Sequence, residues 1–217
     1  MAKKYDVVIV GGGPAGIFTA LELAQSTKLS VLLLEKGPAL GRRGCIARER
    51  GVPCPPCVPC TMVTGWGGAG AFSDGKLTLS PEVGGYLTDY VPPAKAAELI
   101  DRADNIYVQY GGTDHIFGMN GSVEELRRRA ISAQLQLIPV KIRHLGTERC
   151  VEVLTNMHDF LSSRVEVRTM AAAERILTND GEAVGVVTGK GEDLAGFVPG
   201  AALVQQPGNE LVHHQPR

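Results

Sequence analysis

Residues 5–16, Tyr-Asp-Val-Val-Ile-Val-Gly-Gly-Gly-Pro-Ala-Gly, decide the fold of this chain. The apolar, β-branched run over residues 5–10 predicts a strand that is buried on both faces of a parallel sheet. Glycines then turn the chain, and Pro14 predicts the start of a helix, because the first helical position does not use its N–H. Apolar residues recur at helical spacing as far as Ala24, and residues 30–35 form a second apolar run. This order predicts a strand–helix–strand unit of an α/β fold with a parallel sheet.

The glycines of the turn fit the pattern G-x-G-x-x-G, at Gly11, Gly13 and Gly16. The first glycine permits the tight turn, the second lets a diphosphate approach the backbone, and the third lets helix and strand pack closely. The helix start at Pro14 and Ala15 presents free amides and the positive end of a dipole, which favour a phosphate. Glu35 ends the second strand 19 residues after Gly16, where a carboxylate can accept ribose hydroxyls and would repel a 2′-phosphate. A structural glycine-rich turn in another α/β domain is the alternative.

Composition and net charge limit the kinds of molecule that this chain is expected to bind. The chain has 217 residues, of which 44% are hydrophobic and 21% charged, a globular balance for one domain with an excursion. Its 22 basic and 23 acidic side chains give a net charge of −1, so no basic excess is present to neutralise a nucleic acid. Three glycines and a proline interrupt the first apolar run, which argues against a signal peptide or a membrane helix. We therefore expect a cytoplasmic protein that acts on a small-molecule substrate, with the substrate and oligomeric state left open.

Periodicity divides the rest of the chain. Residues 37–85 form a Gly/Pro/Cys-rich insertion, and loops of such length are usually functional. Helical periodicity resumes over residues 92–163, which we interpret as part of a second lobe. Apolar segments on either side of Asn-Asp-Gly at 179–181 predict a β-hairpin within a small meander. Residues 1–190 are thus expected to form one nucleotide-binding domain, and residues 191–217 an atypical tail.

Four cysteines lie close together in the insertion, at Cys45, Cys54, Cys57 and Cys60. The spacing C-x-x-C-x-x-C of the last three allows thiolates to converge on one ion. Zinc accepts a tetrahedral four-sulfur set, and iron–sulfur clusters use a similar spacing. A redox-active thiol pair and a set of reduced thiols in a proline-stiffened loop are further alternatives. The sequence leaves these alternatives open, although an odd total of five cysteines does not indicate a secreted disulfide framework.

Two segments resemble known flavoproteins. Residues 6–17, with Leu-Leu-Glu-Lys-Gly at 33–37, are similar to the amino-terminal FAD site of the glutathione-reductase-like flavoproteins. Residues 65–77, Gly-Trp-Gly-Gly-Ala-Gly-Ala-Phe-Ser-Asp-Gly-Lys-Leu, resemble a stretch in the FAD-dependent dehydrogenases, a family of FAD/NAD(P)-binding oxidoreductases. The resemblance runs from about residue 5 to about residue 191. It implies a Rossmann-type FAD-binding domain and an FAD-dependent oxidoreductase, with NAD(P)H as a candidate electron donor.

The resemblance also implies further cofactor contacts. The flavin side of FAD would be approached by the backbone of a glycine-rich loop at Gly67, Gly68, Ala69 and Gly70. Ser73 would lie near that loop, and Ala173 would read the adenine edge. Lys36 follows the ribose acid within the matching segment. Arg43 is either a charge beside the diphosphate or a solvated loop arginine.

After residue 191 the resemblance ends. In related flavoproteins an apolar strand returns to a glycine-containing turn, and a long substrate-binding portion follows. Here Phe197-Val198 is too short, and Pro199 comes too early, for a good central strand. Such a tail is what a truncation or a shifted reading frame would give. We therefore expect an FAD-dependent oxidoreductase or an amino-terminal fragment of one, whose catalytic residues and retained activity are open. The alternative is a non-catalytic dinucleotide- or metal-binding protein with a structural cysteine loop.

Overall fold

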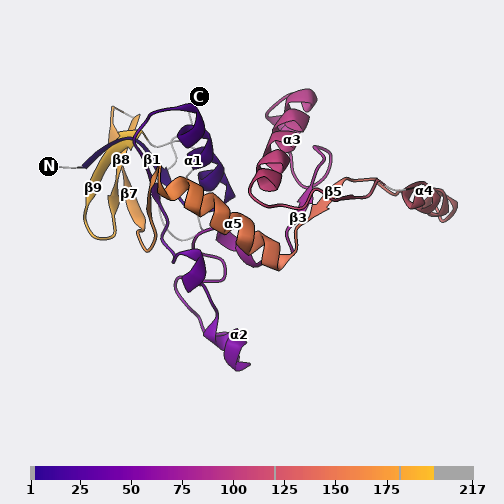
Figure 1. Ribbon diagram of the computed structural model, residues 1–217, viewed down its shortest axis with the longest axis horizontal. Coiled ribbons are helices and arrows are strands. Elements are labelled where there is room, and N and C mark those ends of the chain that lie inside the picture. Colours follow the sequence, from indigo (N-terminus) through magenta and orange to yellow (C-terminus); the bar gives the residue numbers. More distant parts are fainter. Residues whose placement is uncertain (1–2, 120, 181, 198–217) are drawn as a thin grey trace. The chain divides into compact units, whose positions relative to one another are not determined.

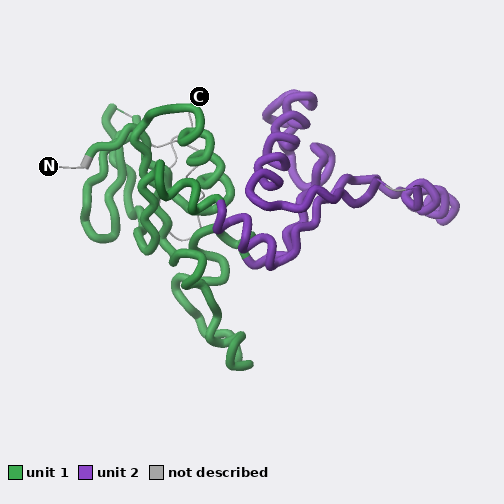
Figure 2. Tube along the Cα trace, in the orientation of Figure 1, with its two compact units in different colours: residues 1–71, 157–217 green, residues 72–156 purple. Residues whose placement is uncertain are grey.

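Two sheets organise the chain in its computed structural model (Figure 1). The structure describes residues 3–119, 121–180 and 182–197. The chain divides into two units, the first made of residues 1–71 and 157–217 and the second of residues 72–156 (Figure 2). The first unit holds a six-stranded sheet and the second a three-stranded one.

The sheet of the first unit is mostly parallel. Its strands lie in the order β6 (Glu166–Arg168), β2 (Val31–Leu34), β1 (Lys3–Val10), β9 (Asp193–Phe197), β8 (Glu182–Thr188) and β7 (Ala173–Asn179). The first four run parallel to one another, whereas β9, β8 and β7 form an antiparallel meander. This arrangement confirms the predicted Rossmann-type α/β fold. The predicted hairpin is also confirmed, since Asn179 pairs with Glu182 and Asp180 adopts a φ of +50°.

The helix α1 (Pro14–Ser26) covers β1 and β2 (Figure 1). Its buried residues are Gly16, Ile17, Ala20 and Leu21. These positions recur at intervals of one, three and one residues, which keeps them on one side of a helix with 3.6 residues per turn. All four residues of β2 are buried, as a strand covered on both faces requires.

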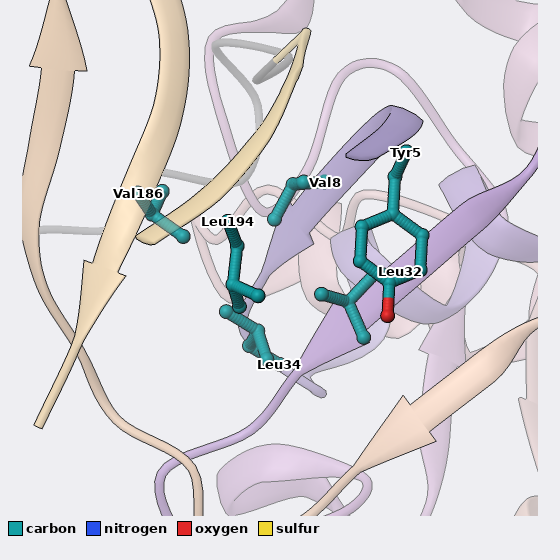
Figure 3. Packing of buried hydrophobic residues seen from close by; sticks show 6 residues of the cluster. All are labelled: Tyr5, Val8, Leu32, Leu34, Val186 and Leu194. Atoms are coloured by element: carbon teal, nitrogen blue, oxygen red, sulfur yellow. The ribbon is translucent and has the colours of Figure 1, made fainter. Parts of the chain in front are cut away.

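A hydrophobic cluster joins the parallel strands to the meander. Figure 3 shows its six buried side chains, which are Tyr5, Val8, Leu32, Leu34, Val186 and Leu194. Complete burial of an aliphatic side chain of this size contributes about 1.5–3 kcal/mol. Because Val186 and Leu194 come from β8 and β9, the meander is held to the parallel strands by packing as well as by hydrogen bonds.

The strand β9 corrects the expectation that no central strand follows residue 191. Residues 193–197 lie between β1 and β8 and pair with both. Leu194 supplies the buried side chain and is 2% exposed. Gly196 allows a close approach to β1, because a Cβ there would stand 2.9 Å from Cγ2 of Val8. Gly196 thus interrupts the apolar run at the point where β9 comes close to β1. Pro199 and the rest of residues 198–217 lie outside the described residues.

The insertion over residues 37–85 contains only short elements. These are η1 (Leu40–Arg42), α2 (Ile46–Arg50), η2 (Gly68–Phe72) and β3 (Lys76–Thr78), and η3 (Leu87–Asp89) follows just after the insertion. The second unit has β3 paired with β5 (Ile142–His144), which pairs in turn with β4 (Ile116–Phe117). Its helices are α3 (Pro93–Gln109), α4 (Ser122–Ser132) and the first part of α5 (Thr147–Ser162). Among the described helices, none has the length and apolar character that a membrane span requires.

A buried ion pair ties β5 to α3 in the second unit. Arg143 and Asp104 are 5% and 8% exposed. Nε of Arg143 donates to Oδ1 of Asp104 at 2.5 Å, and the second guanidinium contact, to Oδ2, measures 2.7 Å. The guanidinium also donates to the carbonyl of Thr113. The hydrogen bond with Asp104 raises the pKa of Arg143 in spite of its burial. Removal of one charge would leave the other buried without its partner.

We expect Arg143→Met to lower the free energy of unfolding by about 3–5 kcal/mol, the usual cost of breaking a buried pair on one side. Urea denaturation measures this change. The control is Glu125→Gln, which breaks the pair with Arg128 whose side chains are 56% and 69% exposed. That change should cost less than about 1 kcal/mol. Equal effects of the two substitutions would contradict the assignment.

The thiol of Cys150 should make stability depend on alkaline pH. Cys150 on α5 is 7% exposed and faces Gly75. Burial, followed by the charge of Asp74, raises the pKa of this thiol. The unfolded chain, with a thiol pKa of about 8.5, therefore loses the proton first, so this contribution is complete below that pH and is lost as pH rises.

We expect the difference in free energy of unfolding between the natural chain and Cys150→Ala to stay constant below about pH 8. It should shrink above about pH 9, because only the natural chain has this thiol to ionise on unfolding. Denaturation curves between about pH 7 and pH 10.5 measure it, over the range in which a thiol titrates. A difference that stays constant over the whole range would refute the prediction.

Candidate functional site: a cradle at the end of β1

The end of β1 turns tightly into α1. Gly11 has a φ of +107°, a conformation that favours glycine. Gly16 packs closely against Gly11. A Cβ on Gly16 would stand 1.9 Å from the carbonyl oxygen of Gly11, so there is no room for a side chain. The first and third glycines of the fingerprint therefore have the conformational and packing roles that the sequence predicted.

The second glycine of the fingerprint, Gly13, faces open space at the start of α1. It is the N-cap residue, and no side-chain hydrogen bond caps the helix there. A Cβ on Gly13 would meet no atom within 4 Å. Pro14 has no N–H, so the amides of Ala15 and Gly16 are those that the first turn directs toward this space. Amides of this kind, at the positive end of a helix dipole, form a binding site for an anion.

The carboxylate of Glu35 joins three glycine segments at this turn. Glu35 is 6% exposed. Its Oε2 accepts a hydrogen bond from the amide of Gly12 at 2.6 Å. Its Oε1 accepts from the amides of Gly37 at 2.7 Å and Gly65 at 3.0 Å. The sequence predicted an acid beside the opening turn of α1, and the structure places it there. The three amide partners were missed, since a main-chain N–H has no sequence signal beyond the presence of glycine.

The glycine-rich loop of residues 65–70 lies directly on the fingerprint turn. The amide of Gly67 donates to the carbonyl of Gly12 at 2.7 Å. A Cβ on Gly68, which has a φ of +60°, would stand 3.3 Å from Cα of Gly13. Ala69 and Gly70 are exposed on η2. The structure thus brings Gly67 and Gly68 to the cradle. Whether the backbone of this loop approaches a flavin stays a prediction.

Arg43 holds the segment that precedes the loop. Its side chain is 8% exposed, so the expectation of a solvated loop arginine is wrong. The guanidinium donates to three carbonyl oxygens, at 2.9 Å to Thr61, 2.9 Å to Met62 and 2.6 Å to Trp66. Burial lowers the pKa of Arg43, and the negative charge of Glu35 opposes this shift. Arg43 therefore stabilises the loop, while a contact with a diphosphate stays a prediction.

The segment before β7 contacts the backbone of Glu35 and Gly37. Ala173, predicted to read an adenine edge, is paired with Thr188 in the hairpin. Ala171 instead donates its amide to the carbonyl of Glu35 at 2.9 Å, and Met170 donates to the carbonyl of Gly37 at 2.8 Å. Met170 has a φ of +55°, which is unusual for a residue with a side chain. Residues 167–172 line a pocket of the first unit together with residues 188–190 and Glu192.

The two remaining predicted contacts are exposed residues. Lys36 follows Glu35 and is exposed. Ser73 belongs to the second unit, where its Oγ accepts a hydrogen bond from the amide of Gly75 at 3.1 Å. Neither position tests a contact with a cofactor, so both stay predictions.

The structure does not bring the four clustered cysteines together. All are free thiols, with Cys54 and Cys57 exposed and Cys45 and Cys60 partly buried. Across the described residues, no three side chains of His, Cys, Asp or Glu are placed to hold a metal ion. The prediction of converging thiolates is therefore not met. Prolines 53, 55, 56 and 59 stand next to the last three cysteines, and a proline favours extended backbone at its own position and at the residue before it.

The segment that forms most of this cradle is similar to a known protein family. Residues 6–57 match the family described as "FAD dependent oxidoreductase". This match covers about a quarter of the chain, so the likeness to that family is a likeness of this segment. The matched range includes residues 6–10 of β1, the fingerprint turn, α1, β2 and Glu35, which are the residues that form the cradle.

Individual relatives match parts of the chain. A digeranylgeranylglycerophospholipid reductase of Methanospirillum hungatei is 54% identical over 41 residues, which is 19% of this chain and 10% of the reductase. An uncharacterized protein of Clostridium beijerinckii is 33% identical over 128 residues, or 58% of this chain and 23% of that protein. The chain therefore spans less than a quarter of the length of either relative.

A solved structure supports the fold. The 3-ketosteroid-Δ4-(5α)-dehydrogenase of Rhodococcus jostii RHA1, in complex with 4-androstene-3,17-dione, superposes with a TM-score of 0.52 at 16% sequence identity. The match covers 90% of this chain and 44% of the dehydrogenase. At this identity the likeness establishes a shared fold.

We expect Glu35→Gln to lower the free energy of unfolding by about 1–3 kcal/mol, because a carboxamide turns an N–H₂ donor toward at least one of the three amides. Thermal or urea denaturation of the cofactor-free chain measures the change. Glu82→Gln, at an exposed position, is the matched control and should change stability by less than about 0.5 kcal/mol. If both substitutions cost the same, the buried hydrogen bonds of Glu35 do not stabilise the fold.

Proposed function

We propose that this chain binds FAD at the turn between β1 and α1 and that it is an FAD-dependent oxidoreductase or part of one. The observation that carries the proposal is the start of α1. Its N-cap is a glycine with open space over it, and no side chain caps it; the first-turn amides of a helix have no partner within the helix. A diphosphate satisfies such amides and needs a backbone without a Cβ at Gly13. The family match over residues 6–57 supports the same ligand.

The surrounding residues suit the adenosine half of FAD. The carboxylate of Glu35 already accepts three amides, and a carboxylate has about four acceptor positions, so one remains for a ribose hydroxyl. A buried negative charge at this point would repel a 2′-phosphate. The backbone of residues 170–172 runs beside Glu35 and lines a pocket, which supports an adenine position there.

The oxidation–reduction step would belong to the isoalloxazine ring of FAD, which carries the hydride chemistry when bound. The chain's part is to bind and orient the cofactor. Gly67 and Gly68 hold the glycine-rich loop against the turn that takes the diphosphate. NAD(P)H is the proposed electron donor, on the resemblance of residues 65–77 to the FAD-dependent dehydrogenases. A cytoplasmic location and a small-molecule substrate likewise stay proposals.

We expect Gly13→Ala to raise the Kd for FAD by about ten-fold or more, which corresponds to 1.4 kcal/mol. The added methyl group occupies the space that the diphosphate needs. The free energy of unfolding without cofactor should fall by no more than about 0.5 kcal/mol, because the methyl group meets no other atom of the fold. Titration calorimetry and urea denaturation measure the two quantities.

The control for this substitution is Gly85→Ala in the second unit, where an added Cβ also meets nothing within 4 Å. It should change neither FAD affinity nor stability appreciably. Unchanged FAD affinity in Gly13→Ala would overturn the proposed diphosphate site. If neither the natural chain nor Gly13→Ala binds FAD, the proposed function as a whole is overturned.

A further inference from the structure

Glu35 has contacts that binding to ribose alone does not require. Only one of its three amide partners, Gly12, belongs to the fingerprint turn. Gly65 begins the glycine-rich loop, 30 residues further along the chain, and donates to Oε1 at 3.0 Å within a buried environment. The same carboxylate therefore holds the adenosine side of the cradle and the start of the loop.

A second set of hydrogen bonds links the loop to the cradle through Gly12. The amide of Gly12 donates to Oε2 of Glu35 at 2.6 Å, and its carbonyl accepts from the amide of Gly67 at 2.7 Å. Between these two glycine amides of the loop, Trp66 donates to the carbonyl of Pro38 at 3.1 Å. Because Gly12 uses both its amide and its carbonyl in these contacts, its position is fixed by the carboxylate on one side and by the loop on the other. The carboxylate is thus bonded to the loop directly at Gly65 and through Gly12 at Gly67.

The acceptor positions of the carboxylate determine how a ribose can bind. Oε1 accepts two amides and Oε2 accepts one, so the remaining position is on Oε2, the oxygen next to Gly12. A ribose hydroxyl that takes this position fixes the carboxylate without displacing Gly65. Occupation of the adenosine site then stabilises the loop instead of releasing it.

We propose that Glu35 is a positioning residue that couples the adenosine site to the glycine-rich loop of residues 65–70, so that binding of the adenosine half of FAD orders the loop. The inference rests on the proposed FAD site. Because coupling between sites is reciprocal, an ordered loop also raises the affinity for the adenosine half. In this proposal the loop becomes ordered when the adenosine half binds, before the flavin half of FAD contacts it.

Hydrogen exchange of the full chain tests the coupling, with AMP as the probe because it carries adenosine and a phosphate but no flavin. We expect saturating AMP to slow exchange of the amides of residues 65–70 by about ten-fold in the natural chain. In Glu35→Gln, exchange without ligand should be faster by about ten-fold. AMP still binds this variant through the cradle at higher concentration, but it should not slow exchange of the loop. Glu82→Gln should behave as the natural chain does.

A second variant separates coupling from loop stability. Arg43→Lys removes part of the support that three carbonyls receive from the guanidinium but leaves Glu35 in place. We expect faster exchange without ligand and retained slowing by saturating AMP. Glu35→Asp, which keeps the charge and shortens its reach, replaces Glu35→Gln if that variant does not fold, and it should lose most of the AMP effect.

The results distinguish the two proposals. AMP that binds the natural chain but leaves exchange of residues 65–70 unchanged, or speeds it, overturns the coupling and leaves the FAD site standing. The coupling also fails if AMP slows exchange in Glu35→Gln as much as in the natural chain. If neither AMP nor FAD binds the natural chain, the proposed FAD site fails and the coupling fails with it.

Discussion

The segments that form the cradle depend on one buried negative charge. A carboxylate removed from water is costly unless hydrogen bonds replace its hydration. Glu35 receives these bonds from the amides of Gly12, Gly37 and Gly65, three points that are far apart in the sequence. Hydrogen bonds to a charged group are about twice as strong as neutral ones, so the charge holds together the opening turn of α1, the exit of β2 and the glycine-rich loop.

This arrangement requires glycine at the three donors for a steric reason. A Cβ on Gly12 would stand 3.1 Å from Cβ of Glu35, and a Cβ on Gly37 would stand 2.4 Å from the amide nitrogen of Gly65. Gly65 itself has a φ of +122° and is packed against Arg43. The guanidinium of Arg43 donates hydrogen bonds to main-chain carbonyls, and the carboxylate of Glu35 accepts them from main-chain amides. In the loop, an amide is thus hydrogen-bonded to the acidic side chain and a carbonyl to the basic one.

The sequence was informative where local spacing determines structure. The fingerprint, the strand after it, Glu35 and the Asn-Asp-Gly hairpin each depend on residues within about thirty positions, and each was predicted correctly. The role of Arg43 was not predicted, because its partners are main-chain carbonyls that any residue has. The strand β9 was missed because its pairing with β1 joins segments about 190 residues apart, and the prediction considered only the short apolar pair Phe197-Val198 and the early Pro199. The regular spacing of the cysteines is a local signal too, yet among the described residues their thiols are not placed as a metal-ligand group, so a metal site there stays a prediction.

The position of β9 has a consequence for biosynthesis. β1 leaves the ribosome long before residues 193–197, which form its neighbour on one side. Until that segment emerges, the nascent chain presents β1 as an open edge with unpaired backbone groups, which is a template for misassembly. Closing the sheet also requires a contact between distant parts of the chain, which slows folding. Production of this protein is therefore expected to depend on protection of the open edge of β1 until residues 193–197 have been made.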